Sequence, residues 1–450
     1  MSAQDPLPDS FAARAAIECA LSAQQAGRLD EAESQFRLVL QRSPDHPDAL
    51  HHLGILLSQK GRPDEAVALV RKSLDLVPDA SGWHNNLGNL LAAQGRNAEA
   101  AQTFIAALQI DSEDPVVWNN LGAVLLREDQ LEESGTAFEN ALFLDPRFED
   151  ALINLGHVQT RQGKSEEAAH SYCSAYVLRP SSDKPKKMLG TAYYTLGRIG
   201  EAAEIYHSWL QEEPDNPIAR HLWASCSGHD VPIRASDAYL ETHFDNTARD
   251  FDANLLRDLA YCIPERVGLA LTKLAVPANS LRVLDAGCGT GLCGPHLAPF
   301  SRNMVGVDLS GKSLALAGEK GHYTELVKGE VVAYLSAAVA RFDLVAAADT
   351  FIYFGDLTPF LMAAAGALGD AGLLMASVEE CRSGFKLNPS GRYSHSREYV
   401  ETAFIAAGFE LLSITAVDIR FELGKPVAGL FVVARKAGVG ALSLIDDFSS

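Results

Sequence analysis

The first half of the chain repeats with a period of 34 residues, and no other feature limits the possible folds as strongly. A glycine recurs at this spacing, each time directly after a leucine: Gly54, Gly88, Gly122, Gly156 and Gly190. A small residue follows each glycine after twelve positions, and a bulky apolar or aromatic residue follows four positions later: Val70, Phe104, Phe138, Tyr172 and Tyr206. A period of this length indicates stacked supersecondary units that bury their apolar faces against one another.

The repeat resembles the tetratricopeptide repeat, whose unit is a helix hairpin of 34 residues. A second set of residues in the same period marks the turn within each hairpin: Gly27, Gly61, Gly95, Asp129, Gly163 and Gly197. There are six units, at residues 13–46, 47–80, 81–114, 115–148, 149–182 and 183–216, followed by a capping helix from Pro217. The sequence thus predicts an α solenoid over residues 13–228, preceded by a disordered segment over residues 1–12.

Three asparagines lie two positions before the signature glycines: Asn86, Asn120 and Asn154. In repeats of this kind the position faces the concave groove, and the series is similar to the asparagine ladder of O-GlcNAc transferases. Side-chain amides at one period offer paired donors and acceptors to an extended peptide, whose own amides also repeat. We therefore expect the solenoid to bind a protein or peptide. The alternative is a common repeat sequence around a solvated groove.

The net charge is −20 with no large basic patch, which argues against binding of nucleic acid through its phosphates. Residues 1–228 carry 32 acidic and 19 basic side chains, a net charge of −13, so the expected partner of the solenoid is neutral or basic. The sequence predicts no signal peptide and no membrane span. The seven cysteines are scattered without a Cys-x-x-Cys pair, so we expect reduced thiols, no metal site and a cytoplasmic protein.

The helical pattern breaks at residues 225–235, where we place the domain boundary. Strands are expected at residues 281–286, 304–309, 325–332, 341–347 and 373–378, with helices between them at about 312–319, 333–340 and 357–368. Two further β-rich runs, 409–419 and 427–435, predict a terminal antiparallel hairpin. Strands separated by helices imply a parallel sheet covered on both faces, here over residues 281–436, with an unstructured tail at 437–450.

The turn after the first strand reads Asp-Ala-Gly-Cys-Gly-Thr-Gly at residues 285–291. A dinucleotide fingerprint would place its third glycine three residues after the second, but that position is Leu292, and the third glycine comes early, at Gly291. A second acid, Asp308, ends the next strand. This layout predicts a site for a nucleoside-like ligand at the carboxyl edge of the sheet, without a pyrophosphate. The alternative is a tight glycine turn that binds nothing.

The turn matches the first motif of class I S-adenosylmethionine-dependent methyltransferases, Asp/Glu-x-Gly-x-Gly-x-Gly, and residues 237–436 resemble that family. The resemblance implies a Rossmann-like seven-stranded sheet and S-adenosylmethionine as the cofactor. The residues that it assigns to the cofactor are Asp285, Gly287, Cys288, Gly289, Gly291, Asp308, Leu309, Glu330 and Asp349. Among them Asp285 would meet the ammonium group, Asp308 the ribose hydroxyls and Glu330 the adenine amine. Asp349 would face the donor sulfonium and the acceptor, or else cap a helix.

Small methyltransferases of this class carry a similar Phe-Asp…Phe-Asp stretch before the sheet, which covers the cofactor. The corresponding segment here is residues 229–280, which we interpret as a linker with lid helices. Tyr239, Phe244 and Phe251 are the candidate lid residues. They could equally be packing contacts between the linker and the core.

Methyl transfer requires mainly that donor and acceptor be aligned, and a general base helps when the acceptor carries a proton. A polar loop at residues 379–396 follows the fifth strand and carries Arg392, Tyr393 and His395. The whole chain resembles bacterial predicted methyltransferases with N-terminal tetratricopeptide repeats, in which a similar Ser-Gly-Arg-Tyr-x-His run occurs. His395 and Tyr393 are therefore our candidates for the catalytic base or a substrate contact, with a helix cap as the alternative for His395.

The sequence thus predicts an S-adenosylmethionine-dependent methyltransferase whose solenoid recruits a protein, peptide or carrier-bound substrate. Two other hypotheses remain open. The chain could be a repeat adaptor whose C-terminal domain binds the cofactor without turnover, or a small-molecule methyltransferase whose repeats only oligomerise it. Residues 349–352 read Asp-Thr-Phe-Ile rather than an Asn-Pro-Pro-Tyr-like run, which disfavours amide and nucleobase amine acceptors.

Overall fold

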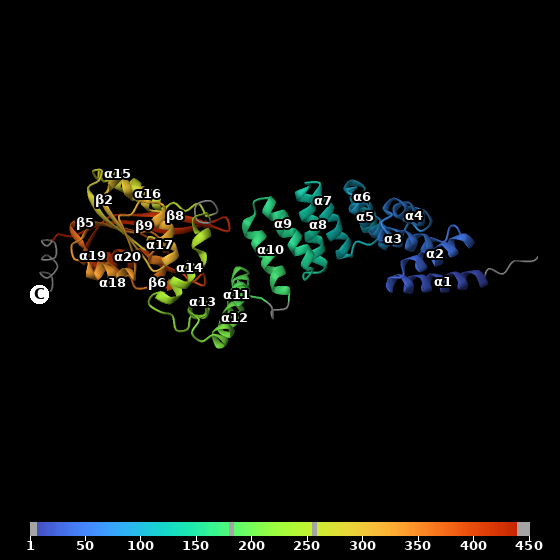
Figure 1. The fold of residues 1–450 in the computed structure, drawn as a ribbon, viewed down its shortest axis with the longest axis horizontal. Helices are drawn as coiled ribbons and strands as arrows, with labels where there is room; N and C mark the ends of the chain where they lie inside the picture. Colours follow the sequence, from blue (N-terminus) through green and yellow to red (C-terminus); the bar gives the residue numbers. More distant parts are fainter. Residues whose placement is uncertain (1–6, 180–183, 254–258, 439–450) are drawn as a thin grey trace, which may run out of the picture. The chain divides into compact units, whose positions relative to one another are not determined.

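The computed structural model describes residues 7–179, 184–253 and 259–438. The chain divides into two compact units, Met1–Arg179 and Pro180–Ser450. The first consists of helix hairpins, and the second contains one more hairpin, a capping helix and a sheet with its helices (Figure 1). The division between the units therefore comes before the last predicted repeat rather than after it, so this hairpin belongs to the unit that holds the sheet.

The N-terminal unit contains helix hairpins at the predicted period of 34 residues (Figure 1). The hairpins are α1 (Leu7–Gln25) with α2 (Leu29–Arg42), α3 (Pro47–Gln59) with α4 (Pro63–Leu76), α5 (Ser81–Ala93) with α6 (Asn97–Ile110), α7 (Pro115–Arg127) with α8 (Leu131–Leu144), and α9 (Glu149–Arg161) with α10 (Ser165–Leu178). The solenoid is thus confirmed. Helix α1 begins at Leu7, inside the segment expected to be disordered, while residues 1–6 lie outside the described part of the chain.

The signature glycines let the two helices of each hairpin cross closely. A Cβ added to Gly122 would lie 2.7 Å from the Phe138 ring, and a Cβ added to Gly54 would lie 2.6 Å from Val70. The bulky side chain sixteen positions after each glycine therefore fills the space that the glycine leaves, which explains why both positions share one period. Between the helices, the turn glycines have φ values from 71° to 76°, and Asp129 in the same register has a φ of 62°.

The asparagine ladder connects consecutive repeats. The Asn120 amide nitrogen donates to Asn85 Oδ1 at 3.0 Å, and the Asn154 amide nitrogen donates to Asn119 Oδ1 at 3.1 Å. Asn86 makes the equivalent contact with the repeat before it. Part of the hydrogen-bonding capacity of each ladder residue is thus used within the stack, although all three side chains remain only half-buried.

The C-terminal unit is built around a mixed sheet (Figure 1). The parallel strands, in spatial order, are β3 (Glu325–Lys328), β2 (Ser301–Asp308), β1 (Leu281–Ala286), β4 (Phe342–Ala347) and β5 (Leu368–Glu380). Strand β9 (Lys425–Lys436) pairs antiparallel with β5 and with β8 (Phe409–Glu422), which confirms the predicted terminal hairpin. A short hairpin of β6 (Phe385–Leu387) and β7 (Tyr393–His395) occurs where the sequence predicted a loop.

Helices cover both faces of this sheet (Figure 1). One face packs against α18 (Val331–Ala337), α19 (Thr358–Ala367) and α20 (Arg397–Ala406), and the other against α15 (Ile263–Lys273) and α16 (Gly294–Leu297). The neighbouring β4 residues Leu344 and Val345 belong to opposite cores, as expected for a strand buried on both faces. The predicted order of an α solenoid followed by an α/β sheet is therefore confirmed.

The last hairpin packs within the C-terminal unit. It consists of α11 (Lys186–Thr195) and α12 (Ile199–Glu212), followed by the capping helix α13 (Pro217–Ser227). His221 of α13 donates from Nε2 to the Gly391 carbonyl oxygen at 2.8 Å. Ile218 shares a small core with Tyr239 and Leu240 of α14 (Asp237–Ala253). These contacts explain why α13 belongs with the sheet.

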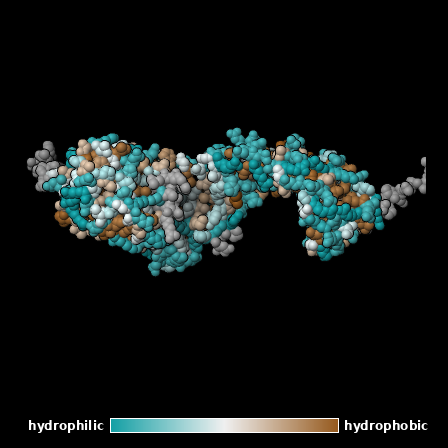
Figure 2. Space-filling view, turned by 45° about the horizontal axis from the view of Figure 1, so that its top comes forward, coloured by the Kyte–Doolittle hydropathy of each residue, from teal (hydrophilic) through white to brown (hydrophobic). Residues whose placement is uncertain are grey.

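In the part of the chain that the structure describes, no helix is long and apolar enough to cross a membrane. The same residues hold no group of three or more histidine, cysteine, aspartate or glutamate side chains that could bind a metal ion. The surface that Figure 2 shows is largely hydrophilic, with small scattered apolar patches.

Replacing Gly88 with alanine should destabilise the repeats, whereas the same change at Gly82 in the same helix should not. A Cβ at position 88 would overlap the Phe104 ring, but a Cβ at position 82 meets no atom within 4 Å. We expect Gly88→Ala to lower the free energy of unfolding by about 1–3 kcal/mol through overpacking. Gly82→Ala should raise it by about 0.5–1 kcal/mol, because alanine has the higher helix propensity. Urea unfolding measures both, and equal effects would contradict the close-crossing interpretation.

Candidate active site

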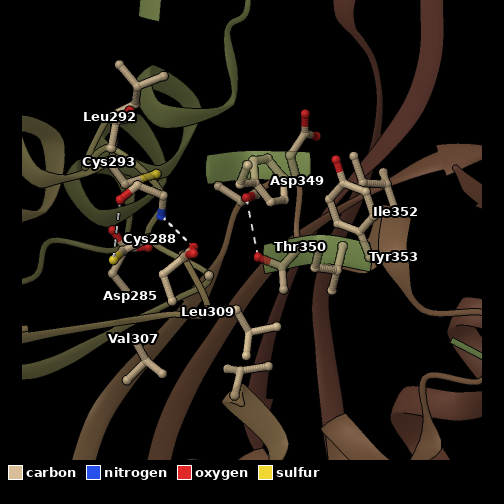
Figure 3. A pocket seen from close by; sticks show the side chains of 18 of the residues that line it. Asp285, Cys288, Leu292, Cys293, Val307, Leu309, Asp349, Thr350, Ile352 and Tyr353 are labelled. Carbon is tan, nitrogen blue, oxygen red and sulfur yellow. Dashed lines mark hydrogen bonds between the residues drawn. The ribbon is translucent and has the colours of Figure 1, made fainter. Parts of the chain in front are cut away.

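A cavity opens where β1, β2 and β4 end, at the carboxyl edge of the sheet. It encloses about 1100 Å³, including the solvent at its mouth. Figure 3 shows Asp285, Cys288 and Leu309 along one side of it, and Asp349 and Tyr353 along the other. Of the residues predicted to hold a cofactor, all except Gly291 line this cavity. The fold therefore brings residues from three strand ends into one site.

The glycine turn is shaped by contacts on one side and open space on the other. Gly287, Gly289 and Gly291 all have positive φ values, of 75°, 52° and 84°. A Cβ on Gly287 would lie 2.6 Å from Oγ1 of Thr350, whose hydroxyl donates to the Ala286 carbonyl oxygen at 2.7 Å. A Cβ on Gly289 would meet no atom within 4 Å. The backbone at Gly289 is therefore open to a ligand in the cavity.

Asp308 joins the second strand to the glycine turn. Its Oδ2 accepts the Gly289 N–H at 2.9 Å, and its Oδ1 accepts the Ser310 N–H at 2.8 Å. Burial raises the pKa of Asp308, while these backbone hydrogen bonds oppose the shift. Each carboxylate oxygen has further lone-pair capacity, so Asp308 could still accept hydrogen bonds from hydroxyl groups of a ligand.

Asp285 is a buried carboxyl group without a cationic partner. Its side chain lies at the end of β1, and its residue is 1% exposed. Burial raises the pKa of Asp285 to about 7, although the Tyr323 hydroxyl donates to its Oδ2 at 2.6 Å and opposes the shift. Among the described residues no basic side chain forms an ion pair with it. A positively charged ligand group in the cavity would therefore complete this site.

Glu330 has a structural role as well as a place in the cavity wall. Its Oε1 accepts the Val332 N–H at 3.0 Å, and its Oε2 accepts the Ala333 N–H at 2.7 Å. It therefore caps the N-terminus of α18, a role that the sequence analysis did not predict.

Acidic side chains of helix α14 contact residues at the carboxyl edge of the sheet. Glu241 pairs with Lys328, the last residue of β3, at 2.6 Å. Asp245 accepts the Ser310 hydroxyl at 2.6 Å. Asp252 accepts a hydrogen bond from the Thr290 hydroxyl of the glycine turn. Three points along one helix thus connect it to the loops that follow β1 and β2 and to the end of β3.

The aromatic residues predicted to form a lid divide between two roles. Phe244 lines the cavity and meets the Tyr353 ring edge to face at 5.5 Å. Tyr239 instead stacks on His221 of α13, with ring centroids 3.9 Å apart, and does not line the cavity. The Phe251 side chain lies outside the described part of the chain. Phe244 thus fits the lid interpretation and Tyr239 the packing interpretation.

A charged cluster forms the end of the cavity opposite the glycine turn. The Arg420 guanidinium is buried and contacts Glu379 through Nη2, Glu422 through Nε at 2.8 Å, and Asp349 through Nη1 at 3.3 Å. Arg392 pairs with the same Glu422. Arg392, Arg420 and Asp349 line the cavity. The site therefore has a carboxylate-rich end beside the glycine turn and a second, mixed-charge end.

Comparison with known proteins assigns both parts of the chain. Family models described as "Tetratricopeptide repeat" match residues 11–79 and residues 51–115 and 119–185. A family model described as "Methyltransferase domain" matches residues 283–372, which include the glycine turn, Asp308 and Asp349. The chain combines tetratricopeptide repeats with a methyltransferase domain.

Curated relatives of the methyltransferase domain are O-methyltransferases by name. The ubiquinone biosynthesis O-methyltransferase of Methylobacterium nodulans is 24% identical over 180 residues, which cover 36% of this chain and 72% of that protein. The magnesium-protoporphyrin O-methyltransferase of Rhodobacter capsulatus is 34% identical over 88 residues, or 19% of this chain and 38% of that protein. For further relatives the match spans about two fifths of their length.

Among solved structures, Pseudomonas aeruginosa pilF is 22% identical, with a TM-score of 0.37, and the match covers 48% of this chain and 98% of that chain. At this TM-score we draw no conclusion from the likeness.

The two residues predicted as catalytic in the methyltransferase domain lie away from its cavity. His395 is fully buried and donates from Nε2 to the Gly355 carbonyl oxygen at 3.1 Å, and burial lowers its pKa to about 4. Tyr393 is also fully buried and donates its hydroxyl to the Pro232 carbonyl oxygen at 2.6 Å. Neither lines the cavity, because strand β7 directs both side chains into the protein interior. The helix cap of α20 is the neighbouring Ser396.

The sequence analysis did not assign Tyr323 or Arg420 to the site of the methyltransferase domain. Tyr323 follows α17 (Gly311–Glu319) and reaches Asp285 across the end of the sheet. Arg420 lies on β8 and contacts carboxylates from β5 and from the end of β4. No local motif surrounds these residues. They reach the site only through the pairing of strands that are distant in the sequence, so the sequence alone could have found them only if that pairing were known.

The buried Asp285 carboxyl should make the ligand-free methyltransferase domain less stable as the pH rises. Its folded-state pKa of about 7 exceeds that of an exposed aspartic acid. The folded state therefore binds the extra proton, and stability is lost as the pH rises from about 4 through 7. Asp285→Asn cannot ionise, so its free energy of unfolding relative to wild type should rise by about 3 kcal/mol between pH 5 and pH 8.

Urea unfolding at each pH measures this difference. The control is Asp370→Asn, which changes an exposed aspartate of the same unit. If the Asp285→Asn and Asp370→Asn variants showed the same pH trend relative to wild type, the buried carboxyl would not be the source of the effect.

Proposed function

We propose that the protein is an S-adenosylmethionine-dependent methyltransferase whose repeats recruit a protein, peptide or carrier-bound substrate. The observation that carries this proposal is the buried Asp285 carboxyl beside an open glycine turn, without a cationic partner among the described side chains. S-Adenosylmethionine has an ammonium group and a sulfonium group, which would supply the positive charge that this edge lacks. The family match over residues 283–372 supports the same assignment.

The residues at the carboxylate-rich end fit this cofactor. Gly289 presents open backbone to the cavity, and Asp308 retains acceptor capacity for two hydroxyl groups. Leu309 offers an apolar surface beside Asp308 for an adenine ring. When bound, the cofactor supplies an electrophilic methyl group. The protein then has to hold both reactants in line and to exclude water. Helix α14, which covers the loops at this edge, would help to exclude water.

The repeats support the recruiting role. Stacked hairpins present an extended surface, and the ladder residues keep acceptor oxygens beyond the hydrogen bonds that connect the repeats. The acidic charge of residues 1–228 favours a neutral or basic partner. The adaptor hypothesis differs in a measurable way, because an adaptor binds the cofactor but transfers no methyl group to any acceptor.

Calorimetric titration of the full chain with S-adenosylmethionine tests the cofactor. We expect binding to the wild type and a loss of affinity of about tenfold or more in Asp308→Ala, which removes charged acceptors. Because Asp285 attracts a cation only when ionised, the affinity of the wild type should increase as the pH rises through about 7. Asp285→Asn should bind more weakly and lose this pH dependence, while Asp370→Asn should behave as the wild type. Absence of binding to the wild type at every pH would contradict the proposal.

Two sets of asparagine substitutions separate the recruiting role of the groove from the stability of the stack. Asn86→Ala/Asn120→Ala/Asn154→Ala removes the ladder amides together with their inter-repeat hydrogen bonds. Asn85→Ala/Asn119→Ala removes two of these bonds from the acceptor side and keeps Asn120 and Asn154. Each lost bond should cost about 0.5–1.5 kcal/mol in urea unfolding. Only the ladder variant should lose affinity for a partner identified with the wild-type chain; equal loss in both would assign the effect to stability.

A further inference from the structure

The mixed-charge end of the cavity contains more negative than positive charge. Its members are Asp349, Glu379, Arg392, Arg420 and Glu422. Arg420 is the centre of this cluster, because its guanidinium contacts all three carboxylates. Two guanidinium groups thus face three carboxylates, so one carboxylate is left without full compensation.

Asp349 is the carboxylate with the weakest pairing. The closest contact between Arg420 and Asp349 is 3.3 Å. Glu422 accepts from Arg420 at 2.8 Å and also pairs with Arg392. Glu379 lies closer to Arg420 than Asp349 does. Of the three carboxylates, Asp349 is the one that lines the cavity. In Figure 3 it lies on the same side of the cavity as Tyr353, across from Asp285 and Cys288. Asp349 is therefore the carboxylate of this cluster that a ligand in the cavity could contact, and its pairing with Arg420 is the longest of the three.

The backbone at Asp349 is strained in a way that fixes this presentation. Its φ is 53°, a left-handed value that costs a residue with a Cβ of the order of 1–2 kcal/mol. Ser377 of β5 accepts the Asp349 N–H at 2.9 Å and donates its hydroxyl to Asp349 Oδ1 at 3.3 Å. Strain of this kind is retained where the surroundings hold it, and it concentrates at functional sites.

The walls beside Asp349 are aromatic. Phe244 and Tyr353 meet edge to face at 5.5 Å, and Tyr261 and Phe354 also line the cavity. Such walls favour a flat aromatic guest, because ring faces and edges attract each other in stacked and T-shaped arrangements. A carboxylate or phosphate acceptor would instead meet the excess negative charge at Asp349.

We propose that Asp349 is the catalytic proton acceptor and that the cavity takes a planar aromatic acceptor that carries a hydroxyl group. This inference rests on the proposed methyltransferase function and assigns its acceptor class. Asp349 takes the hydroxyl proton as the acceptor oxygen forms its bond to the methyl carbon, and the electron pair of the broken carbon–sulfur bond stays on the sulfur of the donor. The positive charge of the donor and the negative charge of Asp349 disappear together, which is favourable in a cavity of low polarity.

The surroundings of Asp349 make it a stronger base than an exposed aspartate. Burial raises its pKa, Arg420 and Arg392 lower it, and Glu422 raises it again. Tyr261, Tyr353 and Cys293 also face Asp349, and burial raises the pKa of each of these groups, so they add no charge of their own at neutral pH. A base whose pKa lies closer to the working pH than that of an exposed aspartate accepts a proton more effectively.

A spectroscopic titration of the full chain tests the proposal without turnover. The protein is saturated with S-adenosylhomocysteine and titrated with 4-nitrocatechol, whose ionised form absorbs visible light. The variant Asp349→Asn keeps the shape of the side chain, and asparagine tolerates a left-handed backbone. Asp418→Asn, an exposed carboxylate on the same strand as Arg420, is the matched control. Thermal unfolding verifies that both variants remain folded.

We expect 4-nitrocatechol to bind to the wild type and to both variants. In Asp349→Asn the pKa of the bound probe should fall by about one unit or more relative to wild type, because a neighbouring negative charge disfavours the phenolate. Asp418→Asn should leave the pKa of the bound probe unchanged. At saturating S-adenosylmethionine, methyl transfer to catechol should fall about 10²- to 10⁴-fold in Asp349→Asn. In wild type, kcat/KM for catechol should rise with pH through the ionisation of Asp349.

The outcomes distinguish a failure of the methyltransferase function from a failure of the acceptor assignment. If S-adenosylhomocysteine did not bind to the wild type, the methyltransferase function itself would be wrong. If it bound but 4-nitrocatechol did not, the acceptor class would be wrong while the function remained. If the probe bound with the same pKa in Asp349→Asn and in the wild type, Asp349 would not contact the hydroxyl group and would not be the base.

Discussion

Buried carboxylates outnumber buried cations at the carboxyl edge of the sheet, and the chemistry of the site follows from this imbalance. Asp285, Asp308 and Asp349 end β1, β2 and β4 or lie just beyond them, and burial raises the pKa of each. Arg420 reaches only Asp349 of the three. An unpaired buried carboxylate destabilises a folded protein. The same groups become favourable once a cationic ligand occupies the cavity, so the imbalance links folded-state stability, pH and ligand binding.

The fold creates the imbalance because parallel strands present their carboxyl ends at one edge. Each acid then gains a partner from elsewhere in the sequence: Tyr323 for Asp285, the Gly289 N–H for Asp308 and Ser377 for Asp349. These partners are neutral donors, so they orient the carboxylates without cancelling their charge. Helix α14 closes the arrangement through acidic residues of its own, which contact basic or hydroxyl groups of the surrounding loops.

The sequence was most informative where a structural rule is local. A period of 34 residues predicts helix hairpins because the glycine and the bulky residue that fills its space lie within one unit, as Gly122 and Phe138 do. The motif at residues 285–291 located the turn for the same reason. Arg420 could not be predicted, because the run at 417–422 alternates like a half-buried strand with Arg420 on its polar side. Two of its three carboxylate partners, Glu379 and Asp349, come from β5 and from beyond the end of β4. The burial of His395 could not be predicted either, since the polar loop forms a hairpin whose second strand, β7, buries its side chains.

The last repeat shows that a period in sequence and a unit in space need not coincide. Helices α11–α13 continue the repeat pattern, yet His221 holds the Gly391 carbonyl next to Arg392, whose side chain lines the cavity. His221 also stacks on Tyr239, and Phe244 on the same helix α14 forms part of the cavity wall. A fragment that began near Arg234 would remove α13 from both contacts. The methyltransferase unit therefore has to be defined from about residue 180, and the end of the solenoid is part of the scaffold around its cavity.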